Sequence, residues 1–175
     1  NISNAHVRYI NSTQGVYNDD VALVKGMRES STPLTATAIV LSYHKGGWFV
    51  DLNGNWYDRI YLGYSPYYRY QSALQRIGST DGNGNLLVSP QDKGRGGWML
   101  DGSIGKSIYL KHGSLSINLM VSNILNNQRI VTGGYEQSRS DYTSSGNSRM
   151  YRFSKNPKKY YALGANGMLN IAYKF

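Results

Sequence analysis

The sequence predicts an all-β protein, a segment of a transmembrane antiparallel β-barrel with about six long strands. Three observations predict this class. Apolar and polar residues alternate over runs longer than the roughly five or six residues usual for a strand. Very short connections alternate with polar connections of more than about thirty residues, which soluble domains rarely contain. The 16 tyrosines and 20 glycines accompany a mean hydropathy of −0.48, as expected where apolar residues alternate with polar ones.

The longest alternating run covers residues 160–175. Successive side chains of a strand point to opposite faces, so this run predicts one strand with an apolar face and a wetter face. The apolar set is Tyr161, Leu163, Ala165, Gly167, Leu169, Ile171, Tyr173 and Phe175. Aromatic rings at both ends of such a band suit the two interfaces of a membrane.

Alternation also predicts strands over residues 34–44, 48–60, 98–110 and 114–122, and a weaker one over residues 1–10. Tight turns at 45–47 and 111–113 join these into two hairpins. Residues 1–10 are interpreted as the end of a strand whose beginning is missing, and residues 11–33 as a loop with a short strand. Lys106 falls on the apolar set of its strand. Either its side chain extends to the interface, or a bulge shifts the alternation.

The hairpin around residues 45–47 favours a barrel most strongly. Trp48 and Trp56 lie on one face, roughly 27 Å apart along a strand, which a tilt of about 40° projects to roughly 20 Å. Asp51, Asn53 and Asn55 lie on the other face. Such groups are costly in a packed core but remain hydrated in a water-lined lumen.

The pattern therefore assigns residues to two faces of a barrel wall. The predicted lipid-facing set includes Trp48, Val50, Leu52, Leu115, Ile117, Leu119, Leu169 and Ile171. The predicted interior set includes Asp51, Asn53, Asn55, Asp101, Asn118, Asn166 and Asn170. A register shift by one residue would exchange the two sets.

Several features limit the alternatives. The chain has no cysteine and no apolar run long enough for a transmembrane helix. No signal peptide is visible, so either it has been removed or the chain is the C-terminal part of a longer protein. The net charge is +9, but the basic residues are scattered and form no stripe, so a nucleic-acid partner is not expected.

Enzymatic activity is not expected either. The three histidines are His6, His44 and His112, and the last two fall at the short turns, away from the long loops. No nucleophile, base and orienting group come together in the pattern, and no metal-ligand spacing is present. We therefore predict no catalytic residue, no metal and no cofactor.

Four segments together resemble the C-terminal barrel strands of TonB-dependent outer-membrane receptors of the Bacteroidetes type. They are residues 32–62 (TPLTATAIVLSYHKGGWFVDLNGNWYDRIYL), 96–110 (GGWMLDGSIGKSIYL), 115–139 (LSINLMVSNILNNQRIVTGGYEQSR) and the terminal strand. The Asn-Ile-Leu-Asn element at 123–126 resembles an asparagine–leucine motif that follows the penultimate strand of that family. These segments cover about half of the chain, and the family includes SusC-like receptors.

The resemblance implies that residues 1–175 are the last strands of a barrel of about 22 strands, without the plug domain and the TonB-contacting segment. It implies active import: extracellular loops capture a nutrient, and the TonB system supplies the energy. The implied partners are the rest of the receptor, the TonB system, the barrel-assembly machinery, a surface lipoprotein, membrane lipid and lipopolysaccharide. The C-terminus would be periplasmic, with Tyr173 and Phe175 as the outer-membrane insertion signal.

Two aromatic and charged clusters in the long loops are candidate ligand residues: Tyr67, Tyr68 and Arg69 in one loop, and Tyr135, Glu136 and Arg139 in the other. Aromatic rings beside arginine suit sugars, peptides and anionic chelates alike, so the ligand is left open. The plainer alternative is that these groups are solvated or lie beside anionic lipopolysaccharide. Two other functions also stay open: a passive porin-like or adhesive barrel, and a soluble binding sandwich.

Overall fold

The computed structural model describes residues 2–11, 13–137, 141–152 and 157–175, and the chain is all-β with antiparallel sheets. Its residues form two compact units (33–60, 95–132 and 161–175 in one; 1–32, 61–94 and 133–160 in the other), which are described separately. No helix in the described part of the chain is both long and apolar enough to cross a membrane.

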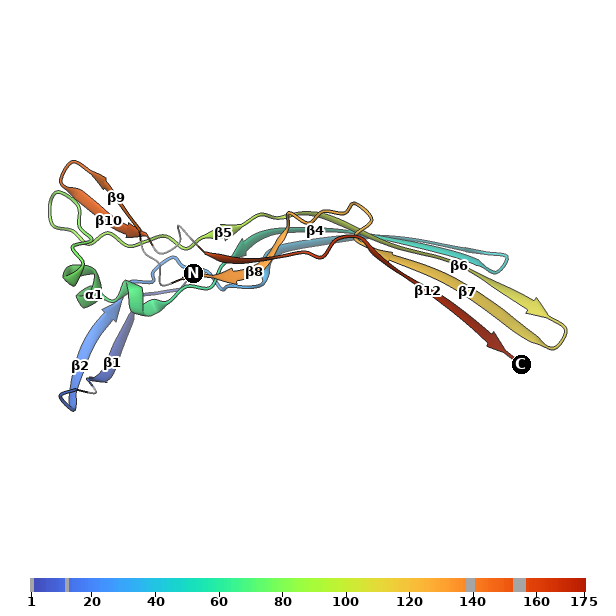
Figure 1. Cartoon of the computed structure of the whole chain (residues 1–175), viewed down its shortest axis with the longest axis horizontal. Coiled ribbons are helices and arrows are strands. Elements are labelled where there is room, and N and C mark those ends of the chain that lie inside the picture. Colours follow the sequence, from blue (N-terminus) through green and yellow to red (C-terminus); the bar gives the residue numbers. More distant parts are fainter. Residues whose placement is uncertain (1, 12, 138–140, 153–156) are drawn as a thin grey trace. The chain divides into compact units, whose positions relative to one another are not determined.

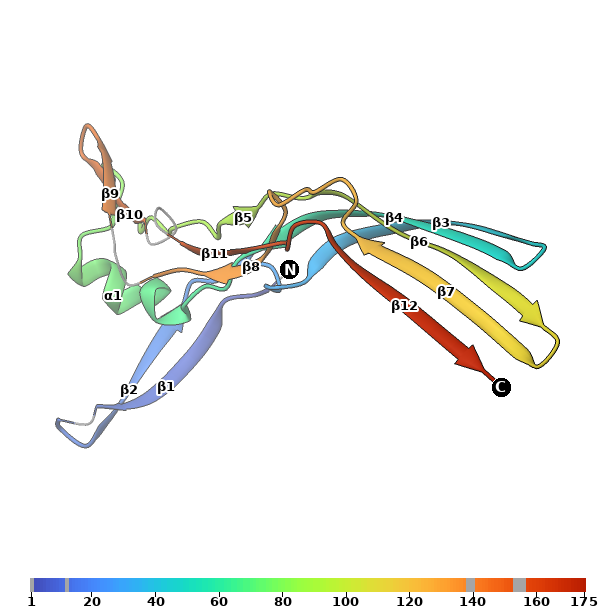
Figure 2. The same ribbon diagram turned by 45° about the vertical axis from the view of Figure 1, so that its right-hand side comes forward.

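Five long strands form the sheet of the first unit: β3 (Pro33–Lys45), β4 (Trp48–Tyr61), β6 (Gly97–Leu110), β7 (Gly113–Ser122) and β12 (Asn166–Lys174). Their order is β12-β7-β6-β4-β3, and neighbouring strands are antiparallel. Figures 1 and 2 show them side by side. Gly46 and Gly47 have φ of 58° and 79°, the left-handed backbone that a two-residue hairpin turn requires. The predicted bounds of β3, β4, β6 and β7 are confirmed to within a residue.

The register of this sheet is continuous through Lys106. Trp48 pairs with Lys106, and Lys106 pairs with Ile117, with no residue skipped on either side. A bulge in β6 is therefore wrong as an explanation for the lysine on the apolar set. Lys106 lies on that face, with its Nζ 4.5 Å from the centroid of the Trp48 ring.

The terminal strand departs from the prediction. Instead of one run over 160–175, the chain forms β11 (Lys158–Tyr161) and then β12. Between them, the amide of Asn123 donates to the carbonyl of Leu163 at 2.7 Å. The side-chain oxygen of Asn126 accepts from the backbone N–H of Ala165 at 3.0 Å. These side chains bind backbone groups that a continuous strand would pair, so the prediction of one uninterrupted strand is wrong.

The second unit contains the rest of the elements. These are β1 (Ala5–Asn11), β2 (Val16–Ala22), the 3₁₀ helix η1 (Pro66–Arg69), α1 (Gln71–Arg76), β5 (Lys93–Gly94), β8 (Val131–Tyr135), β9 (Asp141–Ser145) and β10 (Ser148–Arg152). β1 pairs with β2 in a local hairpin, with Ala5 opposite Ala22. The prediction that residues 1–10 hold the end of one of the long strands is therefore wrong for β1, because a nearby strand offers pairing at a low cost of loop closure.

Each unit has a small core. Ala22, Val24 and Met27 are buried in the second unit, with Tyr70 and Val88 packed around them. The first unit buries Ile60, Ile130 and Ala162. They lie at the end of the sheet opposite the short β3–β4 and β6–β7 turns. Most of the long sheet carries no covering layer among the described residues, which leaves its apolar side chains exposed.

Candidate functional site

Two of the predicted ligand residues form a buried ion pair. Arg69 ends η1, Glu136 follows β8, and both side chains are almost completely inaccessible. The guanidinium donates through Nη1 to Oε2 at 2.8 Å and through Nη2 to Oε1 at 2.5 Å, a bidentate pair. Arg69 also donates to the carbonyls of Ser65 and Ser89, at 3.2 Å each. We infer that the pair holds the two loops together and positions their neighbours, because neither charge is at the surface.

Backbone bonds reinforce this junction. The N–H of Gly63 donates to the carbonyl of Gly134 at 2.8 Å, and the N–H of Glu136 donates to the carbonyl of Gly63 at 2.9 Å. Tyr64 stacks its ring 5.1 Å from the Arg69 guanidinium carbon. Nothing in the sequence pattern links Arg69 with Glu136, because they are 67 positions apart.

The other predicted ligand residues are placed differently. Tyr67 and Tyr135 are about half exposed, whereas Tyr68 is partly buried. The Tyr135 ring lies 6.3 Å from that of Tyr160. Arg139 lies outside the described residues. Of the five predicted residues that the structure describes, Arg69 and Glu136 form an internal pair, Tyr67 and Tyr135 lie at the surface, and Tyr68 is partly buried.

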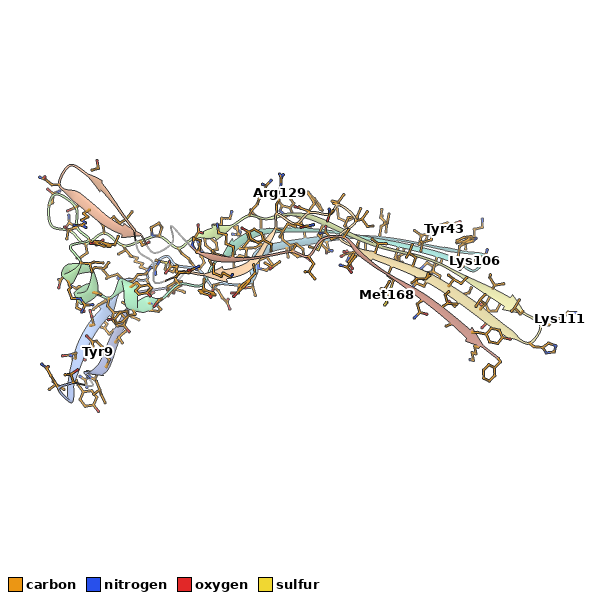
Figure 3. The ribbon with its side chains drawn as sticks, viewed as in Figure 1. Tyr9, Tyr43, Lys106, Lys111, Arg129 and Met168 are labelled. Atoms are coloured by element: carbon orange, nitrogen blue, oxygen red, sulfur yellow. The ribbon has the colours of Figure 1, made fainter. Side chains whose placement is uncertain are left out.

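Tyr67 belongs to a hollow that the sequence analysis missed. The hollow has a volume of about 370 Å³ and is lined by Tyr9, Ile10, Asn18, Tyr67, Tyr70, Ser72, Ala73 and Arg76. The Tyr70 ring stacks on Tyr9 at 6.1 Å and meets Tyr67 edge-on at 5.5 Å; Figure 3 labels Tyr9 on the β1–β2 hairpin. Ring faces beside a guanidinium and an amide can stack and hydrogen-bond a polar ring or a planar anion.

The helix that carries Arg76 is fixed to β2 through Asp20. Burial disfavours ionisation of this carboxyl, but hydrogen bonds from the Ser72 hydroxyl and nearby backbone amides outweigh it and lower the pKa of Asp20. The carboxylate therefore stays ionised at neutral pH and accepts these bonds. This contact sets the position of one wall of the hollow.

The long sheet presents two unlike faces, as predicted. One row across it reads Val50, Ile104, Leu119 and Leu169, and another reads Trp48, Lys106, Ile117 and Ile171. Between these rows on the other face lie Phe49, Gly105, Asn118 and Asn170. The register thus confirms that the two predicted sets occupy opposite faces of one sheet. We call them the apolar face and the polar face.

Hydrogen bonds on the polar face link neighbouring strands. The Ser103 hydroxyl donates to Asp51 at 3.2 Å, and the Asn55 amide donates to Asp101 at 3.4 Å. Asp101 also accepts from the backbone N–H of Asn123 at 2.8 Å. Among the described residues, the side-chain oxygens of Asn53 and Asn118 are buried without a protein partner. Such groups require water or another polar surface.

The asparagines at 123–127 close the far end of β7. Asn123 and Asn126 have φ of 50° and 49°, a left-handed backbone that asparagine tolerates better than most residues. Asn127 donates from its amide to the carbonyl of Trp98 at 3.1 Å. The motif therefore turns the chain while satisfying backbone groups of β6 and of the segment before β12.

The predicted insertion residues lie at the end of β12. The Tyr173 hydroxyl donates to the carbonyl of His112 in the β6–β7 turn at 3.0 Å. The Tyr173 and Phe175 rings are 6.3 Å apart, and Phe175 is almost fully exposed. His44 and His112 lie at the two short turns, as predicted: His44 near the end of β3, and His112 between β6 and β7.

No known protein family, curated protein or solved structure matches this chain. Within the described ranges, no group of three or more histidine, cysteine, aspartate or glutamate side chains is arranged to hold a metal ion.

Proposed function

We propose that the chain is the β-barrel portion of an active outer-membrane importer, which captures a nutrient with its extracellular loops and moves it inward with TonB-supplied energy. The apolar face of the long sheet is the observation that carries this proposal. Isoleucine, leucine and aromatic side chains from five strands are exposed there, including Ile39, Leu41, Tyr43, Trp48, Leu169 and Ile171 at 48–64%. Contiguous apolar patches of this kind mark interaction with a protein or a membrane.

Three further features favour lipid as the contact. The aromatic side chains of Trp48, Trp56 and Trp98 lie toward the two ends of the strands on the apolar face, as at membrane interfaces. The opposite face carries carboxylates such as Asp51 and Asp101, which suits a water-filled interior. Two-residue turns lie at one end of the strands, while the connections that leave the other end are long.

The soluble sandwich is a weaker explanation. A sandwich buries the apolar face of each sheet under a second sheet, and no second sheet among the described residues covers this face, whose side chains stay exposed. The sheet also has two edges, β3 and β12, which require pairing with further strands inside a membrane.

An active importer and a passive porin differ in the ion current that they conduct across a membrane. A barrel that is closed by a plug passes no steady ion current, whereas an open porin does. We therefore expect the purified full-length protein to insert into a planar lipid bilayer without a stable conductance at moderate voltage. Large, steady conductance steps would favour the passive porin-like alternative, and failure to insert would contradict both.

A further inference from the structure

We propose that Lys45 and Lys106, with Trp48 between them, bind the headgroup of an anionic phospholipid on the apolar face; this inference rests on the proposed function, because it requires that face to contact lipid. The three residues lie in one row across neighbouring strands. Lys45 pairs with Trp48, and Trp48 pairs with Lys106. Directly opposed residues share a face, and neighbouring strands are about 4.8 Å apart, so the row spans about 10 Å.

The two lysines are exceptional for their surroundings. The next row toward the middle of the strands is Tyr43, Val50, Ile104, Leu119 and Leu169, which is entirely apolar or aromatic. Among the described residues, neither Lys45 nor Lys106 has a carboxylate within salt-bridge distance. A cation on a lipid-facing strand is costly at the membrane midplane and nearly free of cost at the interface. A pair of such cations beside a tryptophan therefore indicates an interfacial position with an anionic neighbour.

The geometry holds this row in place. The Lys106 ammonium lies 4.5 Å from the Trp48 ring centroid, a cation–π contact that keeps the charge on the face of the sheet. The Gly46–Gly47 turn packs against β6, because the N–H of Ser107 donates to the carbonyl of Gly47 at 2.8 Å. A side chain at position 47 would clash with the Ser107 carbonyl, since an added Cβ would lie 2.4 Å from that oxygen. Figure 3 labels Lys106 on β6 and Tyr43 on β3 in this half of the sheet.

The position of the row selects a phospholipid. Lys45 and Trp48 directly flank the Gly46–Gly47 turn between β3 and β4. The proposed function places the short turns on the periplasmic side. The leaflet at that side is made of phospholipids. Clusters of lysine beside the apolar part of a membrane protein attract anionic headgroups. The ammonium groups would bind the phosphate, while the Trp48 ring packs at the level of the glycerol and upper acyl chain.

The test uses the full-length protein reconstituted with phospholipids whose acyl chains carry bromine, which quenches tryptophan fluorescence on contact. Brominated phosphatidylcholine and brominated phosphatidylglycerol are compared. The difference in fluorescence between the unchanged protein and the Trp48→Phe variant gives the signal of Trp48. We expect both lipids to quench, with phosphatidylglycerol preferred at Trp48. The double variant Lys45→Gln/Lys106→Gln should reduce that preference about tenfold. The matched control is Lys174→Gln, which removes a lysine from the polar face and should leave it unchanged.

The outcomes separate the two proposals. If neither lipid quenches Trp48, the apolar face does not contact lipid and the proposed function fails. If both lipids quench Trp48 equally, or if the double variant keeps the preference for phosphatidylglycerol, the membrane face stands and the headgroup site is wrong. A Lys45→Arg/Lys106→Arg variant keeps the charges. If the arginine variant loses the preference for phosphatidylglycerol as fully as the glutamine variant does, binding through charge is also contradicted.

Discussion

At the scale of single residues, small side chains on the long sheet have different environments on the two faces. On the polar face, the Phe49 ring covers Gly105: a Cβ at position 105 would lie 2.1 Å from the ring and 2.7 Å from the Ile117 carbonyl. Covering a strand glycine with a cross-strand aromatic ring is a known means of stabilising a sheet. On the apolar face, Gly54 lines a hollow of about 330 Å³ and has room for a methyl group.

Alanine at these two glycines should therefore have opposite effects. Gly105→Ala displaces the Phe49 ring and should destabilise the protein by about 1–3 kcal/mol. Gly54→Ala adds only ordinary contacts, the nearest at 3.9 Å, and removes a flexible residue from a strand, so stability should be unchanged or slightly higher. Thermal unfolding in detergent, followed by the heat-dependent shift in electrophoretic mobility, compares the variants. Equal losses at both positions would contradict this packing.

At the scale of elements, the sequence predicts strands that depend on local patterns but not features that depend on contacts between distant residues. β3, β4, β6 and β7 were predictable because two-residue alternation and glycine turns are local. The break before β12 was not, since it depends on Asn123 and Asn126, roughly forty positions away from Leu163 and Ala165. The candidate site was predictable only in part for the same reason. The cluster of aromatic and charged residues in its loop pointed to Tyr67, but the stacking of Tyr9 on Tyr70 and the pairing of Arg69 with Glu136 require the folded chain.

The buried pair gives a prediction for the loops. Glu136→Leu leaves the Arg69 guanidinium buried without its partner and should cost about 3–5 kcal/mol of local stability. In the double variant Arg69→Met/Glu136→Leu, no charge is left buried, and much of that loss should be recovered. Hydrogen exchange of backbone amides in residues 62–70 and 133–137 measures both effects. Additive losses in the double variant would show that the pair does not act as a unit.

At the scale of the whole molecule, the proposed function predicts that the aromatic residues at the end of β12 act in membrane insertion. Tyr173 is bonded to the β6–β7 turn, whereas Phe175 is exposed and Lys174 lies on the opposite face. We expect Tyr173→Ser/Phe175→Ser in the full-length protein to lower its outer-membrane level severalfold, while Lys174→Gln has little effect. The ratio of surface-exposed to total protein measures this. Unchanged surface levels in the double variant would mean that the end of β12 is not an insertion signal.

The opposed faces of the long sheet are the central claim, and adjacent residues on β7 test it most directly. Ile117 lies on the apolar face and Asn118 on the polar face, one position along the same strand. Spin labels are placed at each position in turn in the full-length protein in a lipid bilayer, and a lipid-soluble and a water-soluble quencher are compared. We predict that the label at 117 responds to the lipid-soluble quencher and the label at 118 responds mainly to the water-soluble one or to neither. Equal access of the lipid-soluble quencher to both positions would contradict the membrane assignment.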